Sequence, residues 1–275
     1  MNYSVVIPHG KKAHNLAKAI QSIKDQTLPA SAIVVVCNNG ISLAETKCHL
    51  DDIERDDVVL FDFQSARTAN EARNRGAFET TTGWIAFLDS DDTWLPRYAE
   101  VANNLISAHQ DAEFIYGSYE YFRADGDRRV CLAYPVNRHK TVQEYILRGG
   151  STTTCSMIVK RSLFASVQWD AALKRHQDWD YFVRLYEAAK LSLPVEEPLI
   201  SVDWTNGTAH RHHAACISVT KGWVDKVPPK LFLRYLASQA VGSIRSRDFS
   251  GLVAVSTVLP SAIFRFVASA VSAKE

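Results

Sequence analysis

The chain has 275 residues, 47% of them hydrophobic, and its charges almost balance, with 31 Lys and Arg against 30 Asp and Glu. This length supports one full core with a small extension, and the balanced charge argues against a nucleic-acid binder, which needs a broad basic surface. Five scattered cysteines without a C-x-x-C pair argue against a disulfide framework and indicate a reduced, cytoplasmic protein.

The first half of the chain alternates apolar strands with amphipathic helices. The periodicity predicts strands at 4–7, 33–37, 58–63 and 84–88, and helices at 14–26, 43–53 and 68–79. Such alternation predicts an α/β fold with a mostly parallel central sheet and helices on both faces.

The second half of the chain follows a mixed pattern without an internal repeat. Its predicted elements are a helix at 96–109, a strand at 113–117, a hairpin of 119–123 with 129–134, a helix at 142–147, a strand at 156–160 and a helix at 178–189. The hairpin turn is indicated by Ala124-Asp125-Gly126-Asp127.

Residues 206–227 are polar and rich in histidine, and they predict a flexible loop. This loop is either a plain solvated segment or one that closes over a diphosphate, with Arg211 or a histidine meeting phosphate. A zinc site built from His210, His212, His213 and Cys216 is disfavoured, because no second ligand pair follows at a recognised spacing.

Residues 228–275 predict a helical C-terminal extension. Helices are expected at 230–247 and 251–271, with Pro260 kinking or breaking the second. No N-terminal signal and no uninterrupted apolar run of the roughly 20 residues that cross a bilayer is present, so no spanning helix is predicted. These helices, which carry several arginines, have two interpretations. They pack on the catalytic domain or on a second subunit, or they make peripheral contact with the inner face of the cell membrane.

The most informative segment runs from residue 84 to residue 96. Its apolar strand ends abruptly in Asp89, Ser90, Asp91 and Asp92. Crowded carboxylates repel one another, so a cation or a shared proton must hold them. Because Mg²⁺ and Mn²⁺ prefer oxygen ligands and commonly bridge to phosphates, the segment predicts a metal–diphosphate site at the sheet edge. The alternative is an acidic loop in which Asp92 or Thr93 caps the next helix.

Three further segments join the acidic strand end as candidate site features, and the first of them is expected at the same edge of the sheet. The first follows the first strand, the second precedes the acidic turn, and the third opens a helix whose dipole favours carboxylates in its first turn. The second offers cationic and amide donors for phosphate or ribose oxygens, although each residue alone also fits a solvated helix face. The residues are Pro8-His9-Gly10-Lys11-Lys12, then Arg67, Asn70, Arg73, Asn74 and Arg75, and then His176-Gln177-Asp178-Trp179-Asp180.

Together these segments resemble the family 2 glycosyltransferases, which have the GT-A fold. The resemblance runs from Ser4 to about Asp203 and rests on residues 4–8, 72–76, 83–96 and 177–180. It implies a Rossmann-like catalytic domain over 1–205, with a nucleotide-sugar half at about 1–110 and an acceptor half at about 111–205. It also implies inverting transfer from a nucleotide-diphosphate sugar, with UDP as the preferred carrier, to a hydroxyl of a saccharide or lipid-linked glycan in bacterial surface polysaccharide synthesis, such as O-antigen.

The resemblance assigns roles to particular residues. Asp89 and Asp91 match the D-x-D element, in which Asp91 would bind Mn²⁺ or Mg²⁺ and Asp89 would lie nearer the ribose or a metal-bound water. Asp178 takes the position of the catalytic base. The other nucleotide-sugar contacts are expected from Pro8, His9, Asn38, Arg67, Arg73 and Ser90.

The chain departs from the family pattern at three places. Asn38 stands where an Asp often accepts the imide N–H of the base, and an Asn carbonyl can accept the same bond. The first loop has His9-Gly10 in place of the commoner Thr-x-Asn pattern, and Gln177 stands where Glu is frequent.

Two alternatives remain from the sequence. Residues 89–93 also match the D-x-D-x-T signature of haloacid dehalogenase-type phosphatases, whose first Asp is a covalent nucleophile. Against it, the motif follows three earlier strands, whereas that family opens its sheet with it. The second alternative is a catalytically silent sugar-nucleotide binding domain, to which Asn38 and Gln177 give some weight.

Overall fold

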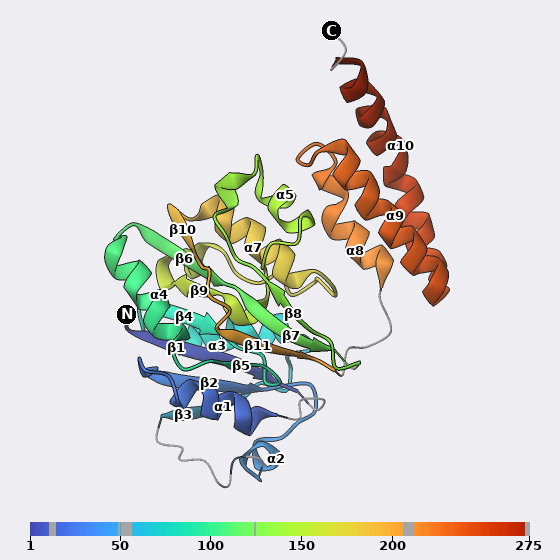
Figure 1. The fold of residues 1–275 in the computed structure, drawn as a ribbon. Helices are drawn as coiled ribbons and strands as arrows, with labels where there is room; N and C mark the ends of the chain where they lie inside the picture. The colour runs from blue at the N-terminus through green and yellow to red at the C-terminus, as the bar shows by residue number, and fades with distance from the viewer. Residues whose placement is uncertain (11–14, 49, 51–56, 124, 206–211, 273–275) are drawn as a thin grey trace.

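A seven-stranded mixed sheet forms the centre of the molecule (Figure 1). The computed structural model describes residues 1–10, 15–48, 50, 57–123, 125–205 and 212–272. The strand order is β10-β6-β9-β4-β1-β2-β3, and only β9 runs against its neighbours among these described strands. The strands are β1 (Tyr3–His9), β2 (Ala32–Cys37), β3 (Val58–Asp62), β4 (Trp84–Phe87), β6 (Ala112–Gly117), β9 (Ile158–Lys160) and β10 (Leu191–Val195). The predicted α/β class with a mostly parallel sheet is therefore confirmed.

Helices cover both faces of this sheet, because side chains alternate between the faces along each strand. In β1, Val6 belongs to one core, while Val5 and Ile7 belong to the other. The first core is completed by α3 (Ala69–Glu79), α5 (Val142–Leu147), α6 (Arg161–Ser166) and α7 (Gln177–Ala188), and the second by α1 (Leu16–Lys24) and α4 (Tyr98–Ala108). A short helix, α2 (Leu43–Cys48), precedes β3.

A smaller four-stranded sheet has the order β5-β11-β7-β8. The predicted hairpin is confirmed, because β7 (Tyr119–Arg123) pairs antiparallel with β8 (Arg128–Cys131). Sequence patterns missed β5 (Thr93–Trp94) and β11 (Ile200–Trp204), which pair with each other. The alternative of a helix cap at the acidic turn is wrong, because Thr93 lies in a strand and α4 begins only after Arg97.

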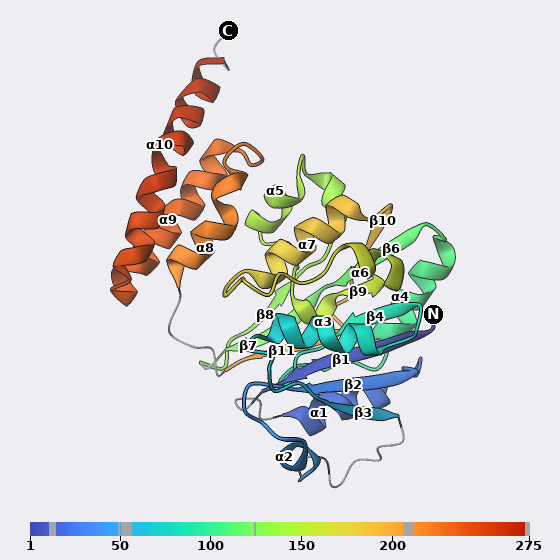
Figure 2. The same ribbon diagram turned by 180° about the vertical axis from the view of Figure 1, so that it is seen from behind.

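The C-terminal segment forms three helices that pack together beside the sheet domain (Figures 1 and 2). They are α8 (His213–Thr220), α9 (Pro229–Ser246) and α10 (Phe249–Ser272). The predicted loop at 206–227 is therefore wrong for residues 213–223, which are helical and bury Ile217 and Trp223. The polar histidines that precede Ala-Ala-Cys-Ile in α8 led the sequence pattern to indicate a loop. His210 and Arg211 lie outside the described residues.

The last helix differs from the sequence prediction in two ways. Pro260 does not end it, since α10 continues from Phe249 to Ser272. In addition, Phe249–Ala270 is the one helix in the described part of the chain that is long and apolar enough to cross a membrane, by length and composition. Arg265 interrupts this apolar run in the sequence, but its guanidinium turns toward Asp225 and the carbonyl of Val224.

Candidate active site

The carboxyl ends of β4, β1 and β2 lie side by side and bring three predicted site segments together. The Leu88 N–H donates to the Val6 carbonyl at 3.1 Å, and the Asn38 N–H donates to the His9 carbonyl at 3.0 Å. Both His9 and Asn38 are buried, and Asp89 follows directly after Leu88. The ends of the first, second and fourth strands, with His9, Asn38 and Asp89, thus lie together at one edge of the sheet.

Helix α3 positions Arg73 over the acidic turn. A capping box between Thr68 and Glu71 fixes the start of the helix. At Gly76 the helix approaches the sheet so closely that a Cβ would lie 2.6 Å from the nearest methyl carbon of Val6. The close approach holds the preceding turn of α3, with Arg73, near the strand ends.

Arg73 is almost fully buried and is the main partner of Asp89. Its Nη2 lies 2.5 Å from Asp89 Oδ1, and its Nη1 donates to Asn70 Oδ1 at 2.8 Å. The guanidinium also lies 4.8 Å from the ring centre of Trp169. These contacts hold Asp89 Oδ1 against Arg73, and Asp89 Oδ2 is then the oxygen that can bind a ligand.

Asp92 is a structural member of the acidic turn. It is 5% exposed, accepts the Cys155 thiol at 2.6 Å through Oδ2, and accepts the Asp203 N–H at 2.9 Å through Oδ1. Burial and the nearby Asp89 and Asp91 charges raise the pKa of Asp92 well above its usual range. The turn is therefore tied to β11 and to the short helix that contains Cys155.

Asp89, Asp92 and Cys155 place potential ligand atoms within 4.8 Å of one another. Both oxygens of Asp92 already accept hydrogen bonds, and the Cys155 thiol is a donor whose pKa is raised well above its usual range by burial. Mg²⁺ and Mn²⁺ also prefer oxygen ligands to a thiol. This trio is consequently a hydrogen-bonded brace for the turn, and Cys155 is a site residue that the sequence did not indicate.

Asp91 is exposed at the edge of the same turn and carries the chemistry expected of a cation ligand. Partial desolvation and the carboxylates of Asp89 and Asp203 raise the pKa of Asp91 to about 6. Carboxylates that hinder each other's ionisation are relieved by a hard cation. The oxygen donors of Asp91 and Asp89 therefore fit Mg²⁺ or Mn²⁺.

Asp178 lies in the first turn of α7 and faces the same space. The helix starts after His176, whose backbone is left-handed and whose ring stacks on Trp179 at 3.8 Å. Asp178 Oδ1 accepts the Trp179 N–H at 3.0 Å. Burial raises the pKa of Asp178 to about 6, while the Arg73 charge lowers it and the Asp89 charge raises it. A carboxylate with this pKa is suited to accept a proton near neutral pH.

An aromatic wall beside Asp178 was missed from the sequence. Trp204, at the end of β11, is 47% exposed, and its ring centre lies 4.2 Å from that of Tyr121 and 6.3 Å from that of Tyr119. Burial, with a smaller contribution from the Asp178 charge, raises the pKa of Tyr119. The alternation of Tyr119 and Tyr121 was a weak signal that they share a face, but nothing local connects them to Trp204.

Of the other predicted nucleotide-sugar residues, two are buried and one is exposed. Pro8 is buried within β1, and Ser90 is 5% exposed within the turn. The Arg67 side chain is exposed before α3, and its backbone N–H donates to Glu71. Among the described residues, the Arg67 guanidinium forms no ion pair.

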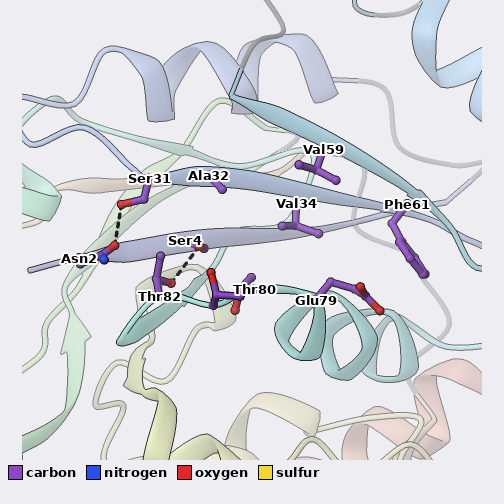
Figure 3. A pocket seen from close by; sticks show the side chains of 11 residues that line it. Asn2, Ser4, Ser31, Ala32, Val34, Val59, Phe61, Glu79, Thr80 and Thr82 are labelled. Carbon is purple, nitrogen blue, oxygen red and sulfur yellow. Dashed lines mark hydrogen bonds between the residues drawn. The ribbon is translucent and has the colours of Figure 1, made fainter.

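A separate pocket lies at the opposite end of the sheet, near the start of β1 and β2 (Figure 3). There, the Ser31 hydroxyl donates to Asn2 Oδ1 at 2.7 Å, and the Thr82 hydroxyl donates to the Ser4 hydroxyl at 2.9 Å. In open α/β sheets, ligands bind beyond the carboxyl ends of strands. This pocket is therefore not part of the candidate active site.

A family model described as glycosyl transferase family 2 matches residues 4–166. The amylovoran biosynthesis glycosyltransferase AmsB of Erwinia amylovora is 24% identical over 242 residues, which cover 85% of this chain and 80% of that protein. A β-1,3-glucosyltransferase of Escherichia coli, WfgD, which is described as acting from UDP-Glc on GlcNAc-diphosphoundecaprenol, is 28% identical over 117 residues, covering 42% of this chain and 45% of that protein.

Solved structures of TarS from S. aureus share the fold. The complex of TarS 1–349 with UDP-GlcNAc gives a TM-score of 0.62 at 14% identity and covers 82% of this chain and 66% of that one. The uncomplexed TarS 1–349 gives 0.61 at 14% identity, with this chain spanning 64% of that one.

The fold and the acidic strand end thus define a GT-A type glycosyltransferase domain. The chain belongs to glycosyl transferase family 2. This membership, together with a motif that follows the fourth strand of the chain, sets aside the haloacid dehalogenase-type phosphatase.

Proposed function

We propose that this protein is an inverting, metal-dependent glycosyltransferase that moves a sugar from a UDP-sugar to a hydroxyl of a saccharide or lipid-linked glycan. The observation that carries the proposal is the convergence of Asp89, Asp91, Arg73 and Asp178 on one space at the strand ends. The similarity to AmsB, an amylovoran biosynthesis glycosyltransferase, and to WfgD, which acts on GlcNAc-diphosphoundecaprenol, supports bacterial surface polysaccharide synthesis as the setting.

In this proposal the donor lies along the ends of β1, β2 and β4. The Asn38 side-chain amide donates to the Thr68 carbonyl at 3.5 Å, which leaves Oδ1 to accept the imide N–H of uracil. The buried His9 and Pro8 would support the strand ends beneath the base, Arg67 would reach the phosphates from the start of α3, and the buried Ser90 would support the turn. Asp91, assisted by Asp89, would hold Mn²⁺ or Mg²⁺ against the diphosphate.

The transfer is a single displacement. The acceptor hydroxyl oxygen forms a bond to the anomeric carbon while the bond from that carbon to the diphosphate oxygen breaks, and the hydroxyl proton passes to Asp178. Asp91 and Asp89 would hold a divalent cation, whose charge would offset the negative charge that builds on the departing diphosphate. Arg73 keeps Asp89 oriented and also limits the rise in the pKa of Asp178, so that the base stays ionised near neutral pH.

The aromatic wall suits a saccharide acceptor. Sugar rings present apolar C–H faces that pack on aromatic rings, whose faces carry negative charge density. Trp204 and Tyr121 offer such a surface, and Tyr119, which contacts Trp204, lies near enough to Asp178 for the two to interact electrostatically. The acceptor would stack there with one hydroxyl directed at the base.

A panel of nucleotide sugars tests the proposal. Thermal stability is measured with each donor in the presence and absence of Mn²⁺, followed by assays of donor hydrolysis and transfer. A ligand at about 100 times its Kd stabilises the folded state by about 2.7 kcal/mol. Stabilisation by a UDP-sugar that depends on Mn²⁺, followed by turnover, supports the proposal. Binding without any turnover would indicate the silent binding domain, and no response to any donor would refute a nucleotide-sugar site.

A further inference from the structure

The outer side of α10 is the largest collection of exposed apolar side chains in the described chain. Sixteen large hydrophobic residues are exposed, and seven of them lie on this helix. A soluble helix normally buries its apolar side and exposes a polar one. The five most exposed are Phe249 (78%), Phe264 (75%), Val253 (63%), Val267 (54%) and Ile263 (47%).

These residues form one continuous stripe. Phe249, Val253, Ile263, Phe264 and Val267 fall on one side of the helix at about 100° per residue, together with Pro260 and the exposed Ser256. The opposite side, with Val255, Val258 and Ala262, is already buried and belongs to the core shared with α9. Helix α10 is therefore apolar on both sides, and only the inner side has a partner among the described residues.

The charges of the segment indicate what covers the outer side. Residues 229–275 contain six Lys and Arg against two acidic residues, and no acidic residue lies within α10. Asp248 is occupied as the cap of α10, accepting the N–H groups of Gly251 and His213. Arg245 and Arg247 are exposed at the start of the stripe and form no ion pair with a described residue. An apolar stripe flanked at its N-terminal end by these two arginines is complementary to the surface of an anionic membrane.

Arg265 decides how the helix meets that surface. Its Nε lies 3.2 Å from Asp225 Oδ1, and its guanidinium donates to the Val224 carbonyl. Crossing the bilayer would require this ion pair and the buried inner side to separate from the rest of the bundle. We infer that α10 lies in the plane of an anionic membrane, with its outer stripe among the acyl chains and Arg245 and Arg247 at the headgroups.

Vesicle flotation of the full chain tests this inference without any sugar donor, so its outcome is separate from that of the proposed function. Vesicles of phosphatidylcholine with about 30% phosphatidylglycerol are compared with phosphatidylcholine alone. We expect binding to the anionic vesicles that weakens with salt. The double variant Phe249→Asp, Phe264→Asp should bind at least about a hundredfold more weakly, since each buried apolar side chain contributes more than about a factor of ten. Arg245→Ala should weaken binding about fivefold.

Phe78→Asp is the matched control, because Phe78 is 55% exposed on α3, outside the stripe. It should bind vesicles as the wild type does, and all variants should keep the wild-type circular dichroism spectrum. Equal vesicle binding by the double variant and the wild type would overturn the inference. So would light scattering that shows a stable dimer which the double variant converts to monomer without any effect on vesicles, because the stripe would then face a second copy. Resistance of the bound protein to alkaline carbonate would overturn the in-plane placement.

Discussion

Replacing Asp178 with asparagine should abolish transfer and, at the same time, stabilise the fold. Burial raises the pKa of Asp178 from 3.8 to about 6. Ionisation of this carboxylate therefore lowers the free energy of unfolding of the protein. A shift of about two pKa units corresponds to about 3 kcal/mol at about 1.4 kcal/mol per unit. Because the side chain keeps partial contact with water, about half of this, about 1–2 kcal/mol, is expected.

The sign of the effect depends on pH. Below about pH 4 the carboxyl is protonated in both the folded and the unfolded states, and the wild type has no penalty. Since the folded-state pKa is raised, the folded protein binds the proton more tightly, and wild-type stability falls as pH rises from about 4 to about 6. The asparagine side chain of the variant cannot ionise, and its carbonyl can still accept the Trp179 N–H. The stabilisation by the variant should therefore be complete at about pH 7.5 and shrink toward about pH 4.

Urea denaturation at about pH 7.5 and about pH 5 measures this difference, and the melting temperature at the higher pH should rise by about 2–5 °C. Transfer should fall by at least about a hundredfold, while UDP affinity stays within about threefold. Asp180→Asn is the control on the same helical turn, because Asp180 pairs with Arg184 at 2.6 Å; it should give no stabilisation and keep its activity. A variant at position 178 with near wild-type turnover, or one less stable than the wild type at the higher pH, would refute the reasoning.

Three further changes probe other parts of the site. Asp91→Ala should remove the Mn²⁺-dependent part of UDP binding, measured by calorimetry with and without the metal. Trp204→Ala should raise the acceptor KM about tenfold, as the loss of a stacking surface worth about 1–1.5 kcal/mol predicts, without changing donor hydrolysis. Gly76→Ala should destabilise the protein by about 1–3 kcal/mol in urea, because its Cβ would lie 2.6 Å from a methyl group of Val6.

Each of these changes has a control and a contradicting outcome. UDP binding that responds to Mn²⁺ equally in Asp91→Ala and wild type would remove Asp91 from the metal site. Trp204→Phe should restore most of the acceptor KM, and an unchanged KM in Trp204→Ala would exclude the aromatic wall as the acceptor surface. Gly83→Ala is the control for Gly76, because its Cβ would lie no nearer than 3.9 Å to another atom outside its immediate neighbours; equal stability of the two variants would contradict tight packing of α3.

Much of the catalytic domain is predictable because its signals are local. Strand and helix periodicity in residues 4–117 requires only neighbouring residues, and the acidic turn appears at a strand end that the apolar run defines. Parallel strands place their carboxyl ends at one edge, which is why the loop with His9 could be grouped with Asp89 from the sequence, whereas Asn38 was added by the family resemblance. The family resemblance added Asp178, whose distance along the chain gives no local clue.

Local patterns failed where a residue's partner lies far along the chain. The histidines before α8 indicated a loop, yet His213 is buried and bonds Gln239, 26 residues later. The strand β5 is only two residues long and exists because it pairs with β11. Such elements are stabilised by tertiary packing, which overrides local propensity.

The sequence by itself determined the α/β order of the domain, the acidic turn and the stretch that becomes α10, since periodicity and composition are properties of neighbouring residues. Only the tertiary structure decided that Asp92 is bound by Cys155, 63 residues away, and by the Asp203 backbone, 111 residues away, so that Asp91 is left as the exposed carboxylate of the turn. It also decided that Arg265 pairs with Asp225 and so leaves the outer side of α10 without a charged side chain among the described residues. Which side chain is buried, paired or exposed depends on partners that the fold brings together, and spacing along the chain does not contain that information.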